Sequence, residues 1–150
     1  MEQDLSLWPK VRNILVIDDD PAMTGLLKMM LSKLGYNCTI AESGAAGLEL
    51  AKTLKPEAVL LDLVMPEMNG YAFLRQWHLL GMSETPVVVL SSRSRADEIQ
   101  KAMALGASGY VIKPVDVRKL AQRLEMVIPG AATQGLDSIS FGDGRSVFRR

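Results

Sequence analysis

Five short runs rich in Val, Ile and Leu recur along the chain and predict five β-strands. The first, third and fourth runs are apolar at successive positions rather than at alternate ones, which is typical of parallel strands covered on both faces. We therefore expect a sheet buried between two layers. The runs span residues 14–17, 38–40, 58–61, 87–90 and 110–112.

Each run is followed by a stretch with helical spacing. After the first run, Asp20 and Pro21 favour a helix start, because the carboxylate can cap the first turn and a proline N–H is not needed there. A stripe of leucine and methionine follows, and Gly35 predicts the C-terminal cap. Similar stripes predict helices over residues 48–54, 71–80, 99–105 and 117–127.

The alternation of strand and helix predicts an α/β fold, a doubly wound parallel sheet of five strands with right-handed crossovers. In such a sheet the ligand site lies at the carboxyl ends of the strands. Residues that carry function should therefore follow several different strands.

Acidic residues follow two of the predicted strands. Asp18, Asp19 and Asp20 end the first run, and Asp62 ends the third. Adjacent carboxylates repel one another, and a hard cation such as Mg²⁺ relieves that repulsion. A carboxylate can also act as a nucleophile toward phosphorus. The alternative is a helix cap at Asp20 with the other carboxylates solvated, and the residues alone leave both interpretations open.

A hydroxyl group and a cation follow two further strands. Ser91 ends the fourth run and could donate a hydrogen bond to a phosphoryl oxygen, while Lys113 ends the fifth and could neutralise phosphoryl charge. Turn chemistry or a surface lysine would explain each residue taken singly. Together with the acids, however, they place matched groups at one end of one sheet. Pro114 also makes a cis bond after Lys113 a reasonable expectation.

The segments around these residues resemble the receiver-domain motifs of bacterial response regulators. The matching segments are ILVIDDDP from Ile14, LLDLVMPEMNG from Leu60, VLSS from Val89 and GASGYVIKP from Gly106. The resemblance covers roughly residues 12–128. It implies a CheY-like, flavodoxin-like (βα)₅ fold with strand order 2-1-3-4-5 and a role in two-component signalling.

The resemblance also implies roles for single residues. Asp62 would accept a phosphoryl group from a sensor histidine kinase or a phosphotransfer protein. Asp18, Asp19, Asp62 and the main-chain carbonyl of Val64 would bind Mg²⁺. Ser91 would bond the phosphoryl group and Lys113 would pair with it.

Further implied roles concern switching and lifetime. Tyr110 would turn inward as Ser91 moves toward the phosphoryl group, and the face of the fourth helix, fifth strand and fifth helix would change. Downstream effectors, a missing output domain or a phosphorylation-dependent homodimer would read that face. Val64 and Arg93 stand where relatives control the access of water, so we expect slow self-dephosphorylation.

Two other functions are compatible with parts of this pattern. Asp18 to Asp20 superficially match the haloacid dehalogenase phosphohydrolase signature, but Ala22 stands where that signature expects Thr or Val. A receiver-like binding module that works without phosphorylation is the second alternative. The combined presence of the acids, Ser91 and Lys113 favours the phosphorylated switch, which would be no enzyme beyond catalysing its own phosphorylation and dephosphorylation.

Composition refines this expectation. Lys plus Arg and Asp plus Glu number 17 each, which does not favour a surface for nucleic acid or for anionic membrane. No apolar run approaches the roughly 20 residues of a membrane helix, and the single Cys38 fits a reducing cytoplasm. We expect an N-terminal extension over residues 1–12, a receiver domain over 13–128, and a flexible tail or linker over 129–150.

Overall fold

The computed structural model describes residues 12–65 and 68–130, in which strands and helices alternate as the apolar pattern predicts. The strands are β1 (Arg12–Ile17), β2 (Tyr36–Ala41), β3 (Ala58–Asp62), β4 (Val87–Ser91) and β5 (Gly109–Ile112). The helices are α1 (Pro21–Lys33), α2 (Gly44–Leu54), α3 (Gly70–Leu79), α4 (Ala96–Ala104) and α5 (Val117–Val127). Residues 1–11 and most of the expected tail lie outside the described residues, so the domain bounds stay predictions.

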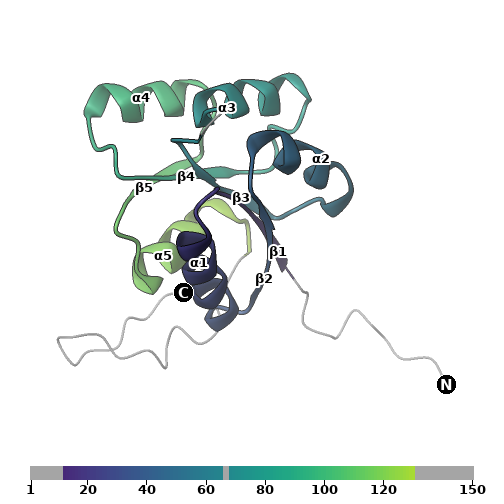
Figure 1. Cartoon of the computed structure of the whole chain (residues 1–150), viewed down its shortest axis with the longest axis vertical. Helices are drawn as coiled ribbons and strands as arrows, with labels where there is room; N and C mark the ends of the chain where they lie inside the picture. Colours follow the sequence, from purple (N-terminus) through teal and green to yellow (C-terminus); the bar gives the residue numbers. More distant parts are fainter. Residues whose placement is uncertain (1–11, 66–67, 131–150) are drawn as a thin grey trace.

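The five strands form one parallel sheet in the order β2-β1-β3-β4-β5. Helices α1 and α5 cover one face of this sheet, and α2, α3 and α4 cover the other (Figure 1). The predicted fold and strand order are therefore confirmed. In the part of the chain that the structure describes, no helix is both long and apolar enough to cross a bilayer.

The sheet divides the apolar core into two clusters, one on each face. Ile14 and Val16 of β1 pack with α1 and α5, whereas Leu15 and Ile17 pack with α2 and α3. Successive strand residues point to opposite faces, so a strand covered on both sides needs apolar side chains at every position. This explains the unbroken apolar runs of β1, β3 and β4.

The helix starts follow from local capping. Asp20 accepts a hydrogen bond from the Ala22 N–H at the start of α1, as predicted, and Asn69 does the same for Ala72 in α3. Helix α2 begins at Gly44, about one turn before the apolar stripe that marked it in the sequence. Gly47 in its first turn has no room for a side chain, because a Cβ there would collide with the Ile17 side chain.

Candidate functional site

The register of the central strands brings two separated acidic segments together. Ile17 of β1 pairs with Leu61 of β3, so Asp18 and Asp62 follow at equivalent positions on neighbouring strands. One carboxylate oxygen from each of Asp18, Asp19 and Asp62 lies within 4.8 Å of the others. The acidic groups that the sequence placed at the strand ends therefore form one cluster.

Asp18 and Asp62 differ from ordinary surface carboxylates in their surroundings. Asp18 is only 2% exposed, and its Oδ1 accepts a hydrogen bond from the Asp20 N–H at 2.9 Å. Asp62 is half-buried, and its Oδ1 accepts one from the Val64 N–H at 3.2 Å. Desolvation raises the pKa of both carboxyl groups, and the main-chain N–H groups offset part of that rise. Ionisation of this cluster therefore carries a cost that a bound cation would remove.

Lys113 is the cation that the fold itself supplies. Its Nζ lies 3.8 Å from Asp18 Oδ2 and 3.8 Å from Asp62 Oδ1. The Lys113 N–H donates to the Ser91 carbonyl at 2.9 Å, which ties the end of β5 to β4 and aims the side chain at the cluster. The Lys113–Pro114 bond is cis, as expected from the sequence. The ammonium group lowers the pKa of both carboxyl groups, although less than desolvation raises it.

The cluster fits a divalent cation by its donor chemistry. The three carboxylates supply only oxygen ligands, which hard ions such as Mg²⁺ prefer, and they come from two strands that hold them rigidly. Two of them are desolvated, so they have few competing water contacts. Asp19 is exposed, which leaves one side of the cluster open to solvent.

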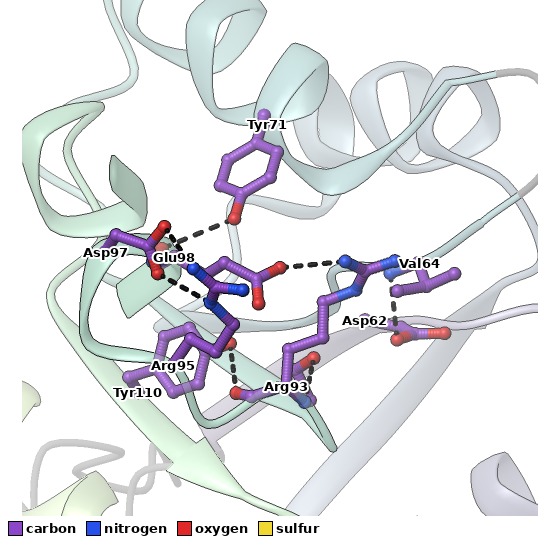
Figure 2. A network of polar contacts seen from close by, with 9 residues as sticks. Asp62, Val64, Tyr71, Arg93, Arg95, Asp97, Glu98 and Tyr110 are labelled. Carbon is purple, nitrogen blue, oxygen red and sulfur yellow. Dashed lines mark hydrogen bonds and ion pairs between the residues drawn. The ribbon is translucent and has the colours of Figure 1, made fainter. Parts of the chain in front are cut away.

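Ser91 and Tyr110 both form hydrogen bonds with the main chain of Arg93. Ser91 is 1% exposed, and its Oγ accepts a hydrogen bond from the Arg93 N–H at 3.1 Å. The Tyr110 hydroxyl donates to the Arg93 carbonyl at 2.7 Å (Figure 2). The two residues expected to act as a switch thus contact the same peptide segment between β4 and α4.

The same segment carries a polar network that no sequence motif predicts. Arg93 Nη1 donates to Glu98 Oε2 at 2.8 Å, and the Tyr71 hydroxyl of α3 donates to the Glu98 carbonyl at 3.3 Å (Figure 2). Arg93 and Glu98 are five residues apart and Arg93 precedes α4, so no helical spacing links them in the sequence. A mixed-charge segment is the only sequence signal of this network.

Comparison with known proteins gives a consistent result for most of the chain. A family model described as response regulator receiver domain matches residues 14–125. Protein PilH of Pseudomonas aeruginosa is 36% identical over 120 residues, which cover 78% of this chain and 98% of PilH. The transcriptional regulatory protein AfsQ1 of Streptomyces coelicolor is 30% identical over 87% of this chain, and the chain spans 57% of AfsQ1.

Solved structures agree with the sequence comparison. A receiver domain protein from Methanospirillum hungatei, described as CheY-like, is 26% identical with a TM-score of 0.72, and the match covers 78% of this chain and 93% of that one. The chemotaxis protein CheY4 of Vibrio cholerae, at 24% identity, shares the fold with a TM-score of 0.75 over 79% of this chain and all of its own.

Proposed function

The chain belongs to the response regulator receiver domain family, which is not a family of catalytic enzymes, and from this premise we propose that it is a phosphorylation-dependent switch. Asp62 accepts the phosphoryl group, and the donor is a sensor histidine kinase or a phosphotransfer protein in the cytoplasm. The observation that carries the proposal is the convergence of Asp18, Asp19, Asp62 and Lys113 at one edge of the sheet.

Phosphoryl transfer to Asp62 requires positioning and neutralisation of charge. An oxygen of the Asp62 carboxylate forms a bond to phosphorus as the bond between phosphorus and the histidine nitrogen of the donor breaks. The Val64 N–H already holds Oδ1 at 3.2 Å, so Oδ2 is the freer nucleophile. Asp18, Asp19, Asp62 and the Val64 carbonyl would hold Mg²⁺, which supplies positive charge to the transferring phosphoryl oxygens when bound.

Lys113 and Ser91 act on the product. The Lys113 ammonium group, 3.8 Å from Asp62, would pair with a phosphoryl oxygen as a point charge. The Ser91 hydroxyl accepts from the Arg93 N–H, which leaves its own proton available for donation to the phosphoryl group. Movement of Ser91 would disturb Arg93 and, through the Arg93 carbonyl, the hydroxyl of Tyr110. Phosphorylation is thereby relayed to the face formed by α4, β5 and α5.

Two side chains are suited to lengthen the life of the phosphoryl group. Val64 is 51% exposed beside Asp62, and its apolar side chain cannot orient an attacking water by a hydrogen bond. Arg93 is a long cation between β4 and α4, and its guanidinium points toward Glu98 (Figure 2). The Val64→Asn variant would therefore lose its phosphoryl group faster than the original chain.

The signal would be passed on by a partner protein or by a further domain. AfsQ1 and the DNA-binding response regulator MtrA of Mycolicibacterium smegmatis are each 30% identical to this chain, which spans 57% of either protein. PilH is matched over nearly its whole length. We propose a receiver domain over residues 13–128 that signals through an effector protein, an output domain attached by residues 129–150, or a phosphorylation-dependent homodimer.

The decisive experiment is intact-mass spectrometry after treatment with acetyl phosphate and Mg²⁺. We expect one phosphoryl adduct on the original chain, none on Asp62→Asn and none in EDTA. Asp97→Asn is the matched control, because it removes one carboxylate from an exposed site on α4 and should be phosphorylated normally. An unlabelled original chain, under conditions that label a known receiver, would support a phosphorylation-independent binding module instead.

A further inference from the structure

Within the part of the chain that the structure describes, Arg93 is held at three atoms, one of which belongs to its side chain. The Ser91 hydroxyl binds its main-chain N–H and the Tyr110 hydroxyl binds its carbonyl, which together fix the backbone. Among residues 12–65 and 68–130, Glu98 makes the contact that fixes the guanidinium, at 2.8 Å (Figure 2). The direction of this cation therefore depends on the Glu98 carboxylate.

Glu98 is less exposed than its neighbour Asp97, whose Oδ1 accepts a hydrogen bond from the Glu98 N–H at 3.0 Å. The Glu98 side chain is 20% exposed, and its main-chain carbonyl accepts from Tyr71, whose ring also carries the Lys101 ammonium group 4.3 Å from its centroid. Asp97 also pairs with an arginine, but the side chains of Asp97 and Arg95 are 69% and 76% exposed. The Glu98 carboxylate is therefore the less exposed of the two acceptors, whereas the Asp97 pair is open to solvent.

A phosphoryl group on Asp62 would compete for the same guanidinium. Asp62 pairs with Leu90 across β3 and β4, so the segment carrying Arg93 begins just beyond the strand position next to the phosphoacceptor. An attached phosphoryl group carries a charge of about −1.5 to −2 in place of the single negative charge of the carboxylate, and a guanidinium matches phosphate oxygens in bidentate geometry. Two anionic groups would therefore compete for the Arg93 guanidinium, namely the Glu98 carboxylate on α4 and the phosphoryl group on β3.

We propose that Glu98 is a positioning residue that holds Arg93 on α4 and thereby shortens the lifetime of the phosphoryl group. The proposal rests on the proposed function, since it needs an acyl phosphate at Asp62. When Glu98 releases the guanidinium, Arg93 pairs with the phosphoryl oxygens and obstructs the approach of water. The balance between the two partners sets the lifetime.

The affected step is hydrolysis of the acyl phosphate. A water oxygen forms a bond to phosphorus, and the bond from phosphorus to the Asp62 oxygen breaks. The bonding pair stays with Asp62, which returns to a carboxylate, and inorganic phosphate leaves while the water proton passes to phosphate or to solvent. No oxidation or reduction takes place.

The test measures the decay of the phosphoryl adduct by intact-mass spectrometry after acetyl phosphate is removed in the presence of Mg²⁺. We expect Glu98→Gln to lengthen the half-life by about two- to fivefold, the range that partly exposed ion pairs support. Asp97→Asn should leave it unchanged, although it removes the same charge from the same turn of α4. In the Arg93→Ala background, Glu98→Gln should have no further effect, because its target is gone.

Each possible result of these measurements either supports or overturns the role of Glu98. An unchanged or shorter half-life in Glu98→Gln, with a normal extent of phosphorylation, overturns the role of Glu98 and leaves the proposed function intact. A lengthening that persists without Arg93, or that Asp97→Asn reproduces, overturns it as well, because either would be a general effect of charge or structure. Absence of an adduct from the original chain would overturn the proposed function and this inference together.

Discussion

The two halves of the carboxyl edge of the sheet differ in how deeply their charged groups are buried and in how closely these groups contact their partners. On the side of β1 and β3, Asp18 is buried and Asp62 half-buried, with their nearest cation, Lys113, at 3.8 Å. On the side of β4 and β5, Arg93, Glu98 and Tyr110 are exposed or half-exposed, and Arg93 binds Glu98 at 2.8 Å and Tyr110 at 2.7 Å. On the β1 and β3 side, keeping the carboxylates ionised costs free energy because they are desolvated. On the β4 and β5 side, water could replace the polar contacts.

This difference suits the two halves to different tasks. Carboxylates desolvated on rigid central strands gain most from a cation or a phosphoryl group, because the ligand removes an existing penalty. Polar contacts at the surface contribute little net free energy, so they can be exchanged for others at small cost. The β1 and β3 side is therefore suited to binding a cation or a phosphoryl group, and the segment between β4 and α4 is suited to a change of conformation.

The largest expected effect tests whether the strands β1 and β3, which carry the acidic cluster, contribute more to stability than the contacts of Arg93. Leu60→Ala in β3 should lower the free energy of unfolding by about 2–5 kcal/mol, because Leu60 is 1% exposed in the core. Arg93→Ala should lower it by less than about 1 kcal/mol. Urea denaturation of both variants measures the comparison. Equal costs would show that the two halves are equally rigid and would remove the basis of the contrast.

A smaller effect concerns Mg²⁺, which should stabilise the original chain. At a concentration about 100 times the dissociation constant, binding to the folded state alone adds about 2.7 kcal/mol to the free energy of unfolding. Asp18→Asn should show far less stabilisation at the same concentration, whereas Asp97→Asn should match the original chain. Denaturation with Mg²⁺ and with EDTA provides the measurement. Equal stabilisation of Asp18→Asn would move the metal site away from this cluster.

The smallest expected effect is the pH dependence of the metal-free protein, because Lys113 and main-chain N–H groups already offset part of the desolvation. The pKa of Asp18 is raised above its ordinary value of 3.8, so the folded state binds this proton more tightly than the unfolded state. The resulting stability is fully present below pH 3.8 and is lost as the pH rises through the raised pKa.

Denaturation in EDTA between pH 4 and pH 7 tests this sign. The stability of the original chain relative to Asp18→Asn should fall as the pH rises, because the asparagine keeps an oxygen for the Asp20 N–H and carries no charge. A relative stability that rises with pH would mean that the Asp18 carboxylate is stabilised in the fold, contrary to the cost assigned to it here.

Much of the secondary structure could be predicted from the sequence, because helix ends are determined by hydrogen bonds and backbone conformations within a few residues. Asp20 and Asn69 cap their helices through hydrogen bonds within a few residues, and Gly35 at the end of α1 has a φ of 88°, a conformation that favours glycine. The apolar stripe predicts the start of α2 too late, because its first turn carries no large apolar residue and Gly47 in it is confined by Ile17, a residue far away in the sequence. Local chemistry was predicted well and long-range packing poorly.

By itself, the sequence determined that strands alternate with helices and that Asp18, Asp62, Ser91 and Lys113 follow four of those strands. Parallel strands end at a common edge, so this pattern already implied a shared site. Only the tertiary structure decided that Lys113 reaches both Asp18 and Asp62, and that Arg93 pairs with Glu98 under Tyr71. Such contacts depend on strand register and on how α3 and α4 pack, and no pattern within a single segment of the chain encodes them.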